Sequence, residues 1–204
     1  MKLNHKIVPL VLITLCILGL QSCKKDKKTT EAAVESVSPV APEEYVDDPF
    51  DLIDEFGIPI ILGKQERATI EKEPYDKWFA ENYKEHTLDT LTVSAIAPQL
   101  TATEITVFMG TWCEDSQLQV PAFFKILDLA GTASSTINLI TINEDKDQPE
   151  DLVAGQDITN VPTIIFKKEG QELGRIVEYP LESLEKDMQK ILNGEEYTHP
   201  YVEE

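Results

Sequence analysis

The sequence predicts an α/β fold in which helices flank a central mixed β-sheet, preceded by an N-terminal extension. Two short apolar runs, Ile105–Met109 and Ile137–Ile142, are rich in β-branched residues and are typical of buried strands. Between them, a helix is expected from about Cys113 to Leu129, and Gly131 follows where a helix commonly ends. The residues expected near its apolar face are Leu118, Pro121, Ala122, Ile126 and Leu129. Parallel strands linked by helices place those helices on the faces of a sheet.

The C-terminal part of the chain completes this sheet. A polar loop and a short helical turn are expected near residue 150. The strands Thr163–Phe166 and Arg175–Tyr179 are expected to form a hairpin through Lys167–Gly170. Apolar residues at helical spacing then predict a last amphipathic helix from Leu181 to Leu192.

The stretch before the first buried strand carries two weaker patterns. The run Ile58–Leu62 is apolar but contains Pro59, which favours a strand at the edge of a sheet. A helix opening at Pro74 is predicted by aromatic residues on one helical face, which are Tyr75, Trp78, Phe79 and Tyr83. Another short helix is expected over 90–100, interrupted or ended by Pro98.

The first residues have the pattern of an export signal. Lys2 and Lys6 border the apolar stretch Ile7–Leu20, which is too short for a comfortable membrane span. The following Leu20-Gln21-Ser22-Cys23 resembles the bacterial lipoprotein box, in which the chain is cleaved before the cysteine and that sulfur is lipidated. The alternative is an ordinary signal peptide with an incidental cysteine. Cys16 would leave with either kind of signal.

These patterns divide the chain into five segments. The stretch after Cys23 begins with Lys24-Lys25-Asp26-Lys27-Lys28, which either contacts lipid headgroups or is a solvated tail, and continues without any aromatic residue. The expected segments are a lipoprotein signal peptide at 1–22, a flexible tether at 23–44, an N-terminal extension at 45–99, a fold core at 100–194 and an acidic tail at 195–204.

The charge balance excludes one class of partner. The chain has 204 residues with 37 acidic and 18 basic side chains, for a formal net charge of -19. A nucleic-acid binder needs a basic face to neutralise phosphates, and the folded part contains no cluster of lysine and arginine. We therefore expect no nucleic-acid partner, and a surface kept soluble by like charge.

A redox-like motif follows the first buried strand. In Trp112-Cys113-Glu114-Asp115-Ser116, a cysteine begins the expected helix and a serine stands where a second cysteine would complete Cys-x-x-Cys. Pro121 lies eight residues after Cys113, Val161-Pro162-Thr163 opens a strand, and Gly170 falls in the last hairpin. In this order and spacing, residues 100–194 resemble a thioredoxin-fold domain, similar to bacterial thioredoxin-like and disulfide-reductase lipoproteins.

The resemblance implies a thiol site. Cys113 would be the nucleophile, with Trp112, Glu114, Asp115, Val161 and a cis Pro162 shaping the site or binding a client. A sulfur at a helix start is favoured as a thiolate by the helix dipole, whereas the carboxylates of Glu114 and Asp115 disfavour its charge. We therefore expect a moderately acidic thiol. The family's buried acidic residue corresponds to Val107, so its usual proton acceptor is missing.

Ser116 restricts what the thiol can do. Its hydroxyl is expected to donate a hydrogen bond to Cys113, but it cannot resolve a mixed disulfide. The first hypothesis is a membrane-tethered thiol-disulfide oxidoreductase or isomerase that uses Cys113 and an external thiol. The alternatives are a thioredoxin-fold lipoprotein that binds a protein partner without catalysis, and a fold retained after loss of activity.

Other kinds of site are weakly indicated. His86 and His199 have no ligand-like spacing near Cys113, and the acidic stretch over 144–151 lacks the glycine-centred pattern of a calcium loop. A peroxide-reducing cysteine lacks the peroxiredoxin pattern, because Thr111 lies two residues before Cys113 rather than three. We expect no metal and no cofactor.

The expected location and partners follow from the two resemblances. A lipidated Cys23 would hold the chain in the bacterial cell envelope, on the outer membrane facing the periplasm or on the cell surface. The expected partners there are exported protein thiols or disulfides, or another protein client, together with an external thiol or redox partner.

Overall fold

The computed structural model describes residues 52–202. The signal peptide at 1–22, the lipidation site Cys23 and the tether at 23–44 lie outside the described residues. Within 52–202 no helix is both long enough and apolar enough to span a membrane.

The described part is an α/β fold with a mixed five-stranded sheet of order β1-β3-β2-β4-β5, which confirms the predicted fold class. The strands are β1 (Gly63–Gln65), β2 (Glu104–Met109), β3 (Ile137–Thr141), β4 (Thr163–Lys168) and β5 (Gln171–Val177). The helices are α1 (Arg67–Ile70), α2 (Asp76–Glu85), α3 (Thr90–Leu100), α4 (Glu114–Ala130), α5 (Glu150–Val153) and α6 (Leu184–Leu192).

Only one pair of neighbouring strands in this sheet is parallel. β2 pairs with β3 in parallel, whereas β4 runs antiparallel to β2, so the prediction of parallel strands linked by helices holds for the first pair alone. The connection from β3 to β4 covers residues 142–162, and its one helix, α5, has only four residues. No long helix carries the chain back along the sheet, and the chain re-enters the sheet from the end at which β3 left it.

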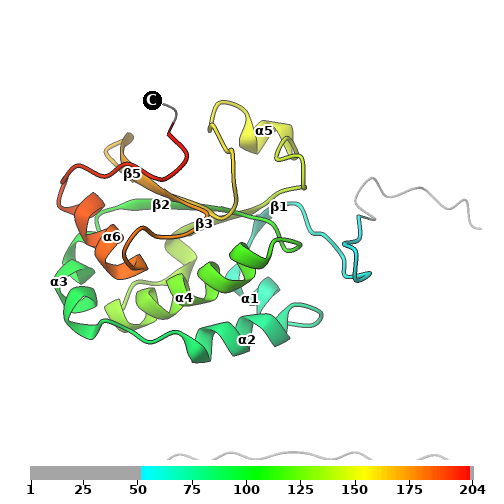
Figure 1. The fold of residues 1–204 in the computed structure, drawn as a ribbon, viewed down its shortest axis with the longest axis horizontal. Helices are drawn as coiled ribbons and strands as arrows, with labels where there is room; N and C mark the ends of the chain where they lie inside the picture. The colour runs from blue at the N-terminus through cyan, green and yellow to red at the C-terminus, as the bar shows by residue number, and fades with distance from the viewer. Residues whose placement is uncertain (1–51, 203–204) are drawn as a thin grey trace, which may run out of the picture. The chain divides into compact units, whose positions relative to one another are not determined.

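The helices cover the two faces of the sheet unequally. Figure 1 shows α1, α2, α3, α4 and α6 on one side of the sheet and α5 on the other. The larger core lies under the first group and includes Phe123, Phe124 and Phe166. The smaller core, on the side of α5, contains Phe108, Ile140 and Ile165, and Trp112 and Cys113 pack against it.

Two predicted positions are wrong in detail. The edge strand is β1 (Gly63–Gln65), not Ile58–Leu62, because Pro59 has no N–H and takes part only in an isolated bridge with Ile53. Leu118 and Leu129 were expected on the buried face of the helix after Cys113, but both are exposed. Pro121, Ala122 and Ile126 are buried as predicted, and the buried face also includes Ser116, Val120, Phe123, Phe124 and Leu127.

The other helices agree more closely with the sequence patterns. The aromatic helix is α2, and Pro98 lies inside α3, which continues to Leu100 rather than ending at the proline. α6 begins at Leu184 and not at Leu181, because Ser183 caps it by accepting a hydrogen bond from the Lys186 N–H. Residues 64–99 share the larger core with the segment after residue 100, since Ile70, Phe79 and Val93 are among its buried members.

Candidate active site

Cys113 lies where the chain passes from β2 into α4. It is the N-cap residue of α4 and has extended backbone angles, and its N–H donates to the Gly110 carbonyl at 3.2 Å. Its side chain is half-buried and forms no capping hydrogen bond with the helix. The thiol instead donates to the carbonyl oxygen of Val161, with 3.1 Å between sulfur and oxygen. The sulfur thus faces the segment before β4.

That segment is the predicted Val161-Pro162-Thr163. The peptide bond between Val161 and Pro162 is cis, and both residues are buried. The carbonyl of Pro162 accepts a hydrogen bond from the Glu178 N–H at 2.7 Å. Two consecutive carbonyls, those of Val161 and Pro162, therefore hold Cys113 on one side and the end of β5 on the other.

Trp112 is folded back over the end of β2. Its Nε1 donates to the Ile142 carbonyl at 2.9 Å. A Cβ added at Gly110 would lie 2.3 Å from Cε2 of the indole, so the ring occupies the space that a side chain at residue 110 would need. Nζ of Lys146 lies 5.9 Å from the indole ring centroid, which places one cation beside the site. The glycine is what allows the indole to pack here.

Ser116 is fully buried and does not contact the sulfur as expected. Its Oγ accepts a hydrogen bond from the Gly110 N–H at 3.2 Å, and no hydrogen bond joins it to Cys113 among residues 52–202. The side chain is directed inward because residue 116 lies on the buried face of α4. Ser116 thus links the first turn of α4 to the end of β2.

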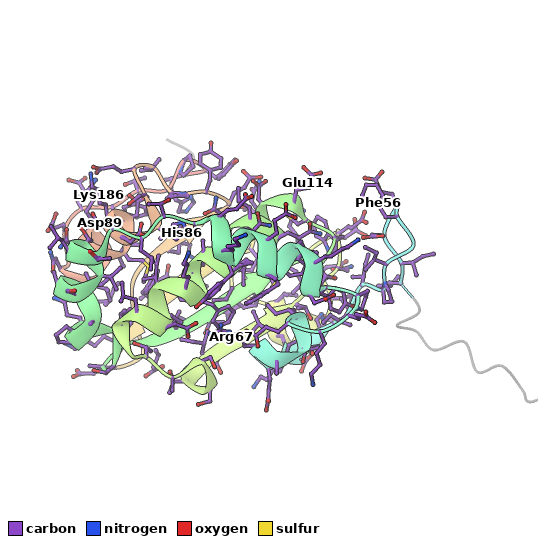
Figure 2. The ribbon with its side chains drawn as sticks, turned by 90° about the horizontal axis from the view of Figure 1, so that it is seen from below. Phe56, Arg67, His86, Asp89, Glu114 and Lys186 are labelled. Carbon is purple, nitrogen blue, oxygen red and sulfur yellow. The ribbon has the colours of Figure 1, made fainter. Side chains whose placement is uncertain are left out.

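The carboxylates beside the sulfur remain at the surface. Glu114 is exposed and Asp115 is half-buried, both in the first turn of α4, and neither forms an ion pair within the described part of the chain. Figure 2 shows the side chain of Glu114 at the surface. Val107, in β2, is fully buried.

The turn after β5 belongs to the site but was not predicted. The sequence pattern extended that strand to Tyr179, whereas β5 ends at Val177. Glu178 then has a φ of 66°, and the Tyr179 N–H donates to the Val177 carbonyl at 2.9 Å. Nothing in the sequence marks this turn, because glutamate is not a residue that favours the left-handed region.

A second polar cluster lies between the helices. Nε2 of His86 is 2.9 Å from Oε1 of Glu185, whose side chain is buried, and the Asp89 N–H donates to the same oxygen at 3.3 Å. Burial alone would raise the pKa of the Glu185 carboxyl, but these hydrogen bonds hold that pKa below its usual value. His86 and Leu118 line a cavity of about 350 Å³ beside this pair.

Metal ligation has no support in the described residues. Within 52–202 no group of three or more histidine, cysteine or acidic side chains is placed to hold a metal ion. His86 is engaged by Glu185, and His199 lies in the segment after α6.

The arrangement defines a class of protein. A cysteine at the start of a helix, directly after a buried strand and facing a cis-proline segment, is the site of thioredoxin-fold proteins. A family model described as thioredoxin matches residues 64–191, more than half of the 204 residues. The chain therefore belongs to the thioredoxin family. No curated protein matches it.

Solved structures resemble the chain at low identity. A protein of unknown function from Pseudomonas aeruginosa is 16% identical, with a TM-score of 0.44, over 64% of this chain and 88% of that one. An HIV epitope scaffold is 19% identical, with a TM-score of 0.45, over 64% and 84%. Mitochondrial thioredoxin 3 from Saccharomyces cerevisiae, in its oxidized form, is 23% identical, with a TM-score of 0.29, over 47% and 86%.

Proposed function

We propose that this protein is a membrane-tethered thiol-disulfide oxidoreductase or isomerase that acts through Cys113 alone and depends on an external thiol. One observation carries the proposal: the Cys113 thiol is half-buried at the start of α4 and lies 3.1 Å from the carbonyl that precedes Pro162. A reactive sulfur in that position can be reached by an extended client segment lying against the Val161-Pro162 backbone.

The chemistry is thiol-disulfide exchange. Cys113 loses its proton to solvent, and its thiolate attacks one sulfur of a client disulfide. A bond forms between Cys113 and that client sulfur while the client disulfide breaks, and the second client sulfur leaves as a thiolate that takes up a proton. The number of thiols and of disulfides is unchanged by this step.

The mixed disulfide must then be resolved from outside the site. Ser116 is buried against Gly110 and has no sulfur to attack with. A thiolate of the client, or of a small external thiol, attacks the mixed disulfide and releases Cys113. Attack by a client thiolate forms a new client disulfide and gives isomerisation. Attack by an external thiolate leaves that thiol joined to the client sulfur, and a second external thiol must attack this bond, forming a disulfide between the two external thiols, to complete reduction of the client.

The tether is proposed from residues 1–23. The apolar stretch Ile7–Leu20 followed by Cys23 supports lipidation at Cys23 and a place in the bacterial cell envelope. Exported disulfide-containing proteins are then the available clients. Cys23→Ser should move the protein from the membrane fraction to the soluble fraction. Retention of that variant on membranes would argue against lipidation at this residue.

The rival proposal is a non-catalytic protein that binds a partner at the same surface. The observation in its favour is the burial of Ser116 at the position where a resolving thiol would be needed. Under this alternative the Val161-Pro162 backbone holds a partner segment and Cys113 forms no covalent bond with it.

An isomerase assay separates the two. A client with scrambled disulfides is incubated with glutathione and catalytic amounts of the protein, and recovery of client activity is followed. We expect the wild-type protein to accelerate recovery and Cys113→Ala to leave it at the rate of glutathione alone. Equal rates for the two proteins would reject the catalytic proposal, and binding of the client by Cys113→Ala would then favour the rival.

A further inference from the structure

A proline inside α4 removes one hydrogen-bond donor of the helix close to Cys113. In an α-helix the carbonyl of residue 117 accepts from the N–H of residue 121, four positions later. That position is occupied by Pro121, which lies within α4 and has no N–H. The carbonyl of Gln117, in the first turn of α4, therefore lacks its usual partner in the helix.

A side chain of α2 supplies a donor in its place. Nδ2 of Asn82 donates to the Gln117 carbonyl at 3.0 Å, from a position 35 residues earlier in the chain. α2 packs against α4 on the same side of the sheet (Figure 1). Both Asn82 and Gln117 are half-buried. The segment before β2 thus completes a hydrogen bond that Pro121 prevents α4 from making.

The side chain of Gln117 reaches back to the segment that carries the sulfur. Its Nε2 donates to the Thr111 carbonyl at 2.8 Å, and its backbone N–H donates to the Cys113 carbonyl at 3.0 Å. Gln117 therefore holds the chain at two points, two residues before the reactive cysteine and at the cysteine itself. The Cys113 thiol in turn lies 3.1 Å from the Val161 carbonyl. A shift of residues 111–113 would move the sulfur relative to that carbonyl.

We propose that Gln117 is a positioning residue for Cys113 and that Asn82 acts on the site through Gln117. The proposal rests on the function proposed above and gives the helix α2 a part in it. Without the Gln117 amide, residues 111–113 lose one of their connections to the first turn of α4, and the sulfur loses its fixed position beside Val161. Misplacement of a reacting atom slows a reaction that needs a defined geometry, as attack on a bound client does. A small reagent that approaches from solvent needs no such alignment.

The test compares two rates for Cys113 in the full chain. Isomerisation of a scrambled client is followed in the assay described above. Alkylation by iodoacetamide is followed by mass spectrometry of the peptide that contains Cys113. Urea denaturation of each variant identifies conditions under which it is fully folded, and both rates are measured under those conditions.

Gln117→Met removes the amide and keeps the length of the side chain. We expect it to slow isomerisation about five- to tenfold and to change the alkylation rate by less than about twofold. The matched control is Gln119→Met, the same change at a half-buried residue of α4 that lines the cavity beside His86. This control should match wild type in both rates. A purely structural role of Gln117 would lower the urea midpoint and leave both rates unchanged.

Pro121→Ala tests the part played by Asn82. It returns an N–H to residue 121, so the Gln117 carbonyl regains a donor within α4. Asn82→Ala alone should slow isomerisation about threefold, as expected for the loss of one hydrogen bond. In the Pro121→Ala background the same change should have little effect. Equal slowing in the two backgrounds would overturn the part assigned to Asn82.

Two results would overturn the role of Gln117 while leaving the thiol function intact. One is isomerisation by Gln117→Met at the wild-type rate. The other is an equal loss in isomerisation and alkylation, which would show that Gln117 changes the reactivity of the thiol and not its position. Wild-type isomerisation no faster than that of Cys113→Ala would instead reject the proposed function, and this proposal with it.

Discussion

The thiol of Cys113 donates to the carbonyl oxygen of Val161, and the next carbonyl along the chain, that of Pro162, accepts from the N–H of Glu178. These two hydrogen bonds join three segments that are far apart in sequence: the start of α4, the entry to β4 and the exit from β5. The sulfur is therefore held against the backbone segment on which the proposed function places an extended client. Its neighbours are carboxylates and an indole, not a second thiol.

Restoring the missing thiol should create a dithiol reductase. In Ser116→Cys, the new sulfur takes the buried position of Ser116 Oγ, which now accepts from the Gly110 N–H. Because sulfur is a weaker acceptor, we expect a loss of about 1 kcal/mol in the free energy of unfolding. We also expect the variant to catalyse reduction of insulin by dithiothreitol. The control is Ser116→Ala, which should show no gain, and a folded Ser116→Cys without activity would contradict the prediction.

The close packing of Gly110 and Trp112 should be visible in stability. Gly110→Ala places a Cβ 2.3 Å from Cε2 of the indole, so the ring must move and lose its hydrogen bond to Ile142. We expect the free energy of unfolding to fall by about 1–3 kcal/mol, measured by urea denaturation. In a Trp112→Ala background the same change should cost much less. Equal costs in the two backgrounds would show that the indole is not the obstacle.

The His86 and Glu185 pair should stabilise the helical layer. His86→Ala removes the side-chain partner of the buried Glu185 carboxylate and leaves it with backbone N–H groups. We expect a loss of about 2–4 kcal/mol in the free energy of unfolding at neutral pH. The control is His199→Ala, since His199 forms no ion pair within residues 52–202, and it should cost less.

The same pair predicts a pH dependence. The pKa of Glu185 is below its usual value in the folded protein, so its contribution is present above the unfolded carboxyl pKa of about 4.3 and is lost as pH falls through the folded-state pKa. The difference in unfolding free energy between wild type and His86→Ala should therefore narrow as the solution is acidified. A difference that stays constant between neutral and acidic pH would contradict this account.

Replacement of Glu178 by glycine should stabilise the protein, whereas glycine substitutions destabilise proteins at most sites. Glu178→Gly removes the penalty of a left-handed conformation, with φ at 66°, and we expect a gain of about 1 kcal/mol in the free energy of unfolding. Glu178→Ala keeps the penalty and should be close to wild type. The midpoints of urea denaturation of wild type, Glu178→Gly and Glu178→Ala test this prediction. A glycine variant less stable than the alanine variant would show that the turn is not strained.

The sequence predicts the strands and the motif better than the contacts between them. The runs at Ile105–Met109 and Ile137–Ile142 match β2 and β3 closely, because a strand that is largely buried needs a mostly apolar run. The cis Pro162 was expected from the resemblance and is found. The direction of β4 was predicted wrongly, because it depends on a connection whose one helix has only four residues and not on any pattern within β4 itself.

The candidate site was predicted only in part, because its contacts also depend on tertiary structure. The motif and the resemblance identified Cys113 and Pro162, but Ser116 was given the wrong hydrogen-bond partner, since the phase of α4 turns that residue inward. Glu178 was missed altogether. Its position next to Pro162 depends on a tertiary backbone hydrogen bond, which no sequence pattern around residue 178 indicates.

The most direct test of the central claim is to trap mixed disulfides of Cys113 in the cells that produce the protein. Cells are quenched with acid, free thiols are alkylated, and adducts of the protein are resolved without reductant and identified by mass spectrometry. We predict adducts joined through Cys113 that disappear on reduction and are absent from cells producing Cys113→Ala. Identical patterns in the two strains, with both proteins present at equal levels, would contradict the proposed thiol function.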